Sequence, residues 1–140
     1  MIVDFLQKMA VNPFKLGNVF NKMKTQAIKT VYGIIYSRNA LITTDVALNM
    51  TPLSIKVSAS LLLSGCRPQI KDKDPINICI NFYHIESIKI YMLDDYPYEK
   101  YSSSSFDEVE EEHRSGNKRY ILSTYDHVFD IVGQYEIVTK

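Results

Sequence analysis

The sequence predicts an α+β fold in which β structure dominates: a mostly antiparallel sheet of about six or seven strands, with an N-terminal helical segment packed on it. Two patterns lead to this prediction. Apolar and polar residues alternate from residue 52 to 63, as in a strand with one buried face and one wet face. Near the N-terminus apolar residues recur at helical spacing instead, and a sheet with one apolar face needs such a cover.

The predicted helical segment spans residues 1–25 and consists of two pieces. Pro13 separates them, because proline disfavours helix in the residue before it. Asn12 is suited to cap a second helix that Pro13 begins. The apolar residues of this second piece share one helical face: Leu16, Val19, Phe20 and Met23.

The expected strands begin with the β-branched and aromatic run 26–36 and continue with 41–48 and 52–63. Residues 76–92 also alternate, as one long strand with a bulge or as two strands joined tightly. We favour two strands, because strands usually have about 3–10 residues. Strands resume at 119–124 and 128–138, with a hairpin at Asp126-His127 between them.

The whole chain, residues 1–140, is expected to form a single domain, since domains commonly have about 100–150 residues. Its β core is expected to comprise residues 26–93 and 117–140. Residues 94–116 are rich in serine and acidic residues, and low hydrophobicity with high net charge favours disorder. This segment is therefore predicted to be an acidic flexible insertion.

Charge is separated along the chain, although the formal net charge is zero. Residues 1–93 carry eleven Lys and Arg against five Asp and Glu, and residues 94–140 carry five against eleven. Such asymmetry favours protein partners or self-association between opposite charges. Nucleic acid is not an expected partner, because its binding needs a stronger basic patch with interleaved aromatic residues.

The sequence contains no catalytic or metal-binding signature, so neither catalytic residues, nor a cofactor, nor a metal is predicted. Five glycines are spread singly, which excludes a glycine-rich phosphate loop, and no Gly-x-Ser-x-Gly elbow occurs. The spacings of the remaining metal-ligand types do not match paired zinc ligands: Cys66, Cys79, His84, His113 and His127. The chain is therefore interpreted as a protein without enzymatic activity.

Two segments supply candidate partner-binding residues. The N-terminal segment is basic and amphipathic, and its end offers Phe5 and Lys8 to a partner. In the acidic segment, aromatic residues spaced among acids are typical of a docking motif. The candidates there are Tyr96, Tyr98, Phe106, Glu108, Glu110, Glu111 and Glu112.

These features predict a non-enzymatic interaction or assembly protein acting through protein–protein contacts. Abundant Lys, Asn, Ile and Tyr are what an AT-rich coding sequence would produce, which points to a virus or an AT-rich microbe. The combination of a basic amphipathic terminus, a compact β domain and an acidic loop fits the layout of a small viral accessory or matrix-like protein. One alternative is a peripheral protein that binds an anionic membrane surface through its basic amphipathic N-terminus. Another is a small enzyme with an unrecognised site. An intracellular location is expected, because neither a signal peptide nor a transmembrane segment is recognisable.

Overall fold

The structure is a computed structural model that describes residues 22–100, 102 and 104–140. Its helical content there is limited to two short 3-10 helices, η1 (Leu63–Gly65) and η2 (Leu93–Asp95). The strands are β1 (Lys22–Met23), β2 (Thr25–Ala27), β3 (Lys29–Thr30), β4 (Gly33–Ile35), β5 (Leu41–Met50), β6 (Leu53–Leu61), β7 (Cys66–Arg67), β8 (Ile76–Met92), β9 (Glu99–Lys100), β10 (Phe106–Val109), β11 (Lys118–Ser123) and β12 (His127–Thr139).

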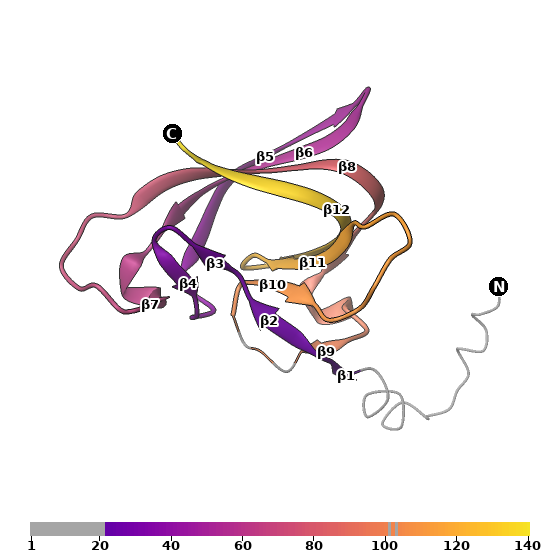
Figure 1. Cartoon of the computed structure of the whole chain (residues 1–140). Helices are drawn as coiled ribbons and strands as arrows, with labels where there is room; N and C mark the ends of the chain where they lie inside the picture. Colours follow the sequence, from indigo (N-terminus) through magenta and orange to yellow (C-terminus); the bar gives the residue numbers. More distant parts are fainter. Residues whose placement is uncertain (1–21, 101, 103) are drawn as a thin grey trace.

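Seven strands form one antiparallel sheet in the order β2-β10-β11-β12-β8-β6-β5. The sheet is strongly curved, and β8 and β12 arch over the shorter strands (Figure 1). A second sheet, β3-β4-β7, lies below this arch, and β1 pairs with β9 in parallel. The predicted antiparallel sheet is therefore present, with β5 and β2 at its two edges.

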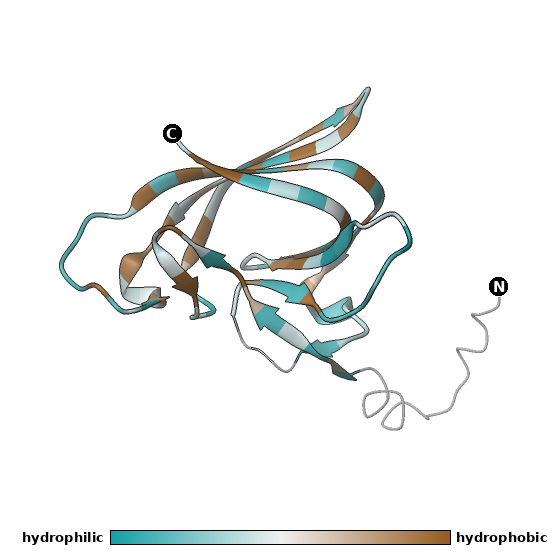
Figure 2. Cartoon of the chain, in the orientation of Figure 1, coloured by the Kyte–Doolittle hydropathy of each residue, from teal (hydrophilic) through white to brown (hydrophobic). Residues whose placement is uncertain are grey.

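The main core fills the space between the curved sheet and the small sheet. Figure 2 shows the alternation of apolar and polar residues along the long strands that makes this possible. Side chains from both sheets meet there, and the largest fully buried ones are Phe82, Phe106, Ile35, Ile55, Leu61, Ile78, Ile80, Leu122 and Ile131. A smaller cluster on the other face of the sheet contains Met23, Val109, Ile121 and Val128.

The predicted helical cover of the sheet is wrong for the part of the chain that the structure describes. Residues 22–25, placed at the end of the helical segment, belong to β1 and β2. Met23 is buried as expected, but a strand that pairs with its neighbours buries it equally well. The concave face is instead covered by the small sheet, through Ile35 and Cys66. Residues 1–21 lie outside the described residues.

The alternation predicted for residues 52–63 holds in part in β6. Ile55, Val57, Ala59 and Leu61 are buried as predicted, and Lys56 is exposed on the other face. The other face is less wet than predicted, because Ser58 is buried. The run 26–36, by contrast, is broken into three short strands. Gly33 has a φ of 111°, a conformation that glycine adopts without strain, and the chain turns back there to pair β3 with β4.

Residues 76–92 form one strand, so the favoured prediction of two strands is wrong and the bulged alternative holds. The irregularity lies where Val132 pairs with Ser87 but Gln134 already pairs with Tyr83. His84 takes up the extra length with a φ of 51°. The bulge lets the strand bend into the arch, which explains how β8 exceeds the usual strand length.

Gly133 lies opposite this bulge and has no room for a side chain. A Cβ atom there would come within 2.9 Å of the backbone oxygen of Tyr83 and 3.3 Å of the Cα of Ile85. Both are backbone atoms of the bulge, so neither can move aside easily. Close approach of two backbones is a common reason for glycine within a strand.

Replacing Gly133 by alanine is expected to lower the free energy of unfolding by about 1–3 kcal/mol, the usual cost of forcing extra atoms into a packed site. Urea unfolding followed by circular dichroism measures it. Gly116→Ala is the comparison, because Gly116 has space for a methyl group but a φ of 83°. Its unfolding free energy should fall only through the unfavourable backbone conformation, by about 1–2 kcal/mol. Unchanged stability of Gly133→Ala would contradict the close packing of β12 on the bulge.

Residues 104–109 do not fit the prediction that residues 94–116 form a flexible insertion. β10 is an interior strand between β2 and β11, and Ser104, Ser105, Phe106 and Asp107 are fully buried. Composition misleads here because the two apolar residues of β10 stand three positions apart, with two acids between them, so that Phe106 and Val109 face cores on opposite sides of the sheet. Within the described residues, no helix has the length and apolar character needed to cross a membrane.

Candidate functional site

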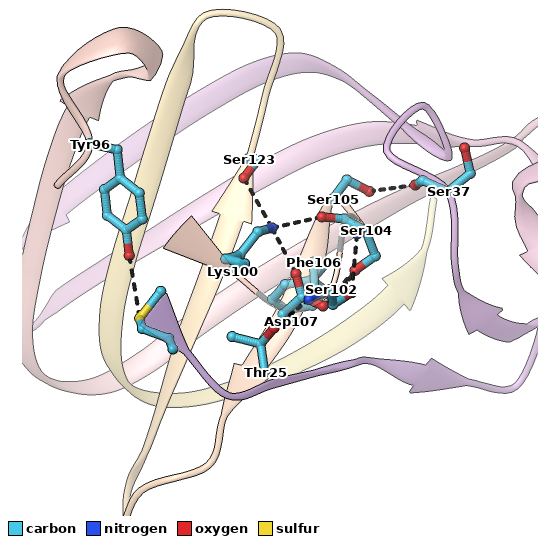
Figure 3. A network of polar contacts seen from close by, with 11 residues as sticks. Thr25, Ser37, Tyr96, Lys100, Ser102, Ser104, Ser105, Phe106, Asp107 and Ser123 are labelled. Carbon is cyan, nitrogen blue, oxygen red and sulfur yellow. Dashed lines mark hydrogen bonds and ion pairs between the residues drawn. The ribbon is translucent and has the colours of Figure 1, made fainter. Parts of the chain in front are cut away.

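The serine-rich segment is held by a buried ion pair between Lys100 and Asp107 (Figure 3). Lys100 Nζ donates to Asp107 Oδ2 and to the carbonyl oxygen of Ser104, each at 2.7 Å, and lies 3.5 Å from Ser123 Oγ. Ser104 Oγ donates to the second Asp107 oxygen at 2.6 Å. Both charges are therefore paired within the protein and hydrogen-bonded further.

This network connects elements rather than presenting a reactive group. Its members come from β9, β10, β11 and the turn between them, and Ser102 joins it to β2 through Thr25. Ser, Lys and Asp side chains in contact could also form a catalytic site, but Ser104 and Asp107 are fully buried. A substrate cannot reach these atoms, so the network is structural.

Tyr96 and Tyr98 take part in a second polar network. Arg119 donates to both carboxylate oxygens of Asp130, at 2.8 and 2.7 Å, and the Tyr96 hydroxyl donates to the same carboxylate at 2.9 Å. Burial, together with the charge of Asp130, raises the pKa of Tyr96. The guanidinium of Arg119 also lies 5.0 Å from the centre of the Tyr98 ring. Both tyrosines therefore already have partners within the chain.

The other predicted partner-binding residues are dispersed. Phe106 is in the core, Glu108 forms an ion pair with Lys118 at 3.3 Å, and Glu111 contacts Arg119 and His113. Glu110 and Glu112 are exposed. Phe5 and Lys8 lie outside the described residues. The structure thus brings no continuous docking surface together from these side chains in the part it describes.

The histidines and cysteines do not converge either. In residues 22–100, 102 and 104–140, no group of three His, Cys, Asp or Glu side chains could hold a metal ion. Cys66 and Cys79 are both free and buried, and burial raises the pKa of the Cys66 thiol. Buried thiols of this kind are unreactive.

The feature that stands out is the free edge of β5. Among residues 22–100, 102 and 104–140, this strand of ten residues pairs with β6 along one side only. Three of its apolar residues point to the same face as the core residues of β6, because Val46 pairs with Val57, Leu48 with Ile55 and Met50 with Leu53. Val57 and Ile55 are buried, yet Val46, Leu48 and Met50 are 39%, 53% and 69% exposed. Leu41 at the start of β5 still belongs to the core, but from Val46 to Met50 the core ends at β6 and the apolar face continues onto β5 as exposed surface.

This edge carries few of the devices that protect free edges from pairing. Natural edge strands are usually short or carry lysine or proline. β5 is long, contains neither, and has Asp45 as its one charged residue. Its bulge at Thr43–Asp45 is partly stabilised by Thr44 Oγ1, which donates to the carbonyl of Ser58 at 3.2 Å. The opposite edge, β2, has only three residues.

A cleft of about 830 Å³ adjoins the edge. The first half of β5, from Leu41 to Val46, forms one wall, and the turn from Ser123 to His127 forms the other. Leu93 and Phe129 add apolar side chains to the lining, and Arg38 and Asp126 add charged ones. Leu48 and Met50 lie further along β5, outside the cleft. One strand therefore carries a hollow at one end and exposed apolar side chains at the other.

Local sequence could not reveal this site, because residues 41–48 were recognisable as a strand but not as an edge. The one available signal is the scarcity of charge between Leu41 and Met50. No family model matches this chain, and comparisons with curated proteins and with solved structures found no match. The function must therefore be inferred from the geometry of the β5 edge and its cleft.

Proposed function

We propose that this chain is a non-enzymatic interaction or assembly protein that binds a protein partner by adding a strand to the free edge of β5. The observation that carries the proposal is the ten-residue unpaired edge with exposed apolar side chains on its core-facing side. In strand addition, backbone hydrogen bonds supply affinity, and pockets for alternate side chains supply specificity. The cleft beside Leu41–Val46 offers such a pocket.

The contacts of the acidic segment also favour the β5 edge as the binding surface. The aromatic anchors expected to bind a partner are engaged inside the chain, Phe106 in the core and Tyr96 with Asp130. The apolar side chains of Val46, Leu48 and Met50 on β5 are exposed instead. We keep a small viral accessory or matrix-like protein, acting inside the cell, as the kind of protein that this layout suggests.

The test is hydrogen exchange of the full chain, read at the amides of β5. Exchange is measured over a concentration series of the chain alone, and with proteins that the wild-type chain retains but Leu48→Lys does not. We expect β5 to exchange at least about tenfold more slowly in one of these conditions, because pairing protects edge amides. Val138→Lys is the control, since Val138 is 42% exposed but lies on the interior strand β12.

The Val138→Lys chain should show the same protection as wild type. The proposal is contradicted if β5 exchanges equally fast alone, concentrated and with retained proteins. It is also contradicted if protection appears elsewhere on the molecule and Leu48→Lys leaves it unchanged.

A further inference from the structure

The hollow and the exposed side chains of β5 are arranged so that one copy of the strand complements another. The cleft is bordered by Leu41–Val46, and the exposed Leu48 and Met50 follow on the same strand. In an antiparallel pair, the end of one strand lies beside the beginning of the other. A second β5 in antiparallel orientation would therefore bring its exposed end to the cleft of the first.

We propose that the partner at the β5 edge is a second copy of this chain, paired β5 to β5′ about a two-fold axis at Ala47. The inference rests on the proposed function and names its partner. In this register Val46 faces Leu48′, and Asp45 faces Asn49′. Met50′ then lies beside the bulge at Thr43–Asp45, where the cleft begins. The same operation places a Met50 side chain beside the start of each cleft, so that the two contacts are equivalent, as in any two-fold interface.

The charges along β5 are compatible with this pairing. Asp45 is the one charged residue of the strand, and in the proposed register it faces the neutral Asn49′ rather than another acid. Directly opposed like charges would destabilise such a pair. Over longer range, the formal net charge of zero means that two copies do not repel each other.

The ordering cost also favours a second copy over an unstructured peptide. β5 is already extended and hydrogen-bonded to β6 along its inner side. A preformed strand loses less conformational freedom on binding than a segment that must become ordered. Ala47 is exposed and small, so two copies can approach closely at the axis.

The first test is sedimentation velocity of the full chain over a concentration series at low and high salt. We expect a monomer–dimer equilibrium that persists at high salt, because the contact is apolar and backbone-mediated rather than charge-driven. Leu48→Lys should weaken dimerisation by about tenfold or more, and Val138→Lys should leave it unchanged. A chain that stays monomeric at every concentration overturns the inference, as does a dimer that Leu48→Lys does not weaken.

The second test reads the register by disulfide trapping. Ala47→Cys places two thiols opposite each other across the axis, within the Cα separation of about 4.4–6.8 Å that a disulfide spans. Asn49→Cys faces Asp45′ instead, which separates the two new thiols by roughly 13 Å along the strands. Cys66 and Cys79 are buried and should not interfere.

Mild oxidation is expected to cross-link Ala47→Cys and not Asn49→Cys. The reverse result, or no cross-linking of either, overturns the proposed pairing. These tests distinguish this inference from the proposed function. If the chain is monomeric but another protein protects β5 from hydrogen exchange, strand addition to β5 stands and only the identity of the partner is wrong.

Discussion

Replacing Phe106 by alanine is expected to lower the free energy of unfolding by about 3–5 kcal/mol, the usual cost of removing a large aromatic side chain from a core. Phe106 is fully buried between two other rings. Its ring centre lies 5.8 Å from that of Phe82 and 5.3 Å from that of Tyr135, both in edge-to-face geometry. Urea unfolding followed by circular dichroism measures the effect.

Tyr125→Ala is the control, because Tyr125 is 94% exposed and should change stability by less than about 0.5 kcal/mol. Deleting residues 102–112 should abolish folding, because the deletion removes Phe106 together with the whole of β10 from the interior of the sheet. A Phe106→Ala protein as stable as wild type would mean that the segment lies outside the core after all.

Replacing Asp107 by alanine is expected to cost about 3–5 kcal/mol, because Lys100 would remain buried with its charge unpaired. The side chains of Lys100 and Asp107 are 10% and 0% exposed, so solvent cannot compensate. Removing both charges, in Lys100→Met with Asp107→Ala, should recover part of the loss. The same unfolding assay measures both variants.

The control is Asp126→Ala, since Asp126 forms an ion pair with His127 at 3.7 Å but its side chain is 64% exposed. Exposed pairs contribute only about 0–1 kcal/mol. Equal losses of stability in Asp107→Ala and Asp126→Ala would contradict the buried ion pair. A double variant that is less stable than Asp107→Ala would show that the charges of Lys100 and Asp107 are not coupled.

Strands with one buried face could be predicted because their pattern is local. The alternation at Ile55, Val57, Ala59 and Leu61 requires only that side chains on a strand point alternately to two faces. The hairpin before His127 is equally local. The bulge in β8 was not decided by its own residues, because it depends on Gly133 of another strand, which permits the two backbones to approach.

The acidic segment shows where composition fails. Asp107 counts as a surface residue in any average, yet it is buried because Lys100 and Ser104 satisfy its oxygens. A pairing between residues seven positions apart, in a segment without regular periodicity, leaves no signature in a hydropathy pattern. The predicted partner-binding role of Tyr96 likewise ignores Asp130, which is distant in sequence.

The residue pattern was enough to predict a mainly antiparallel sheet and the buried face of β6, because both properties follow from the period of each strand. It did not predict that β11 and β12 bury side chains on both faces, at Tyr120 to Ser123 and at Val128 to Ile131. Only the tertiary structure decided which strand lies at an edge, what covers the concave face, and which charges are paired. These depend on contacts between residues far apart in the chain. The exposed face of β5 is the clearest case: Leu48 has the pattern of a core residue, and it is exposed because, in the part of the chain that the structure describes, β5 is the last strand of the sheet.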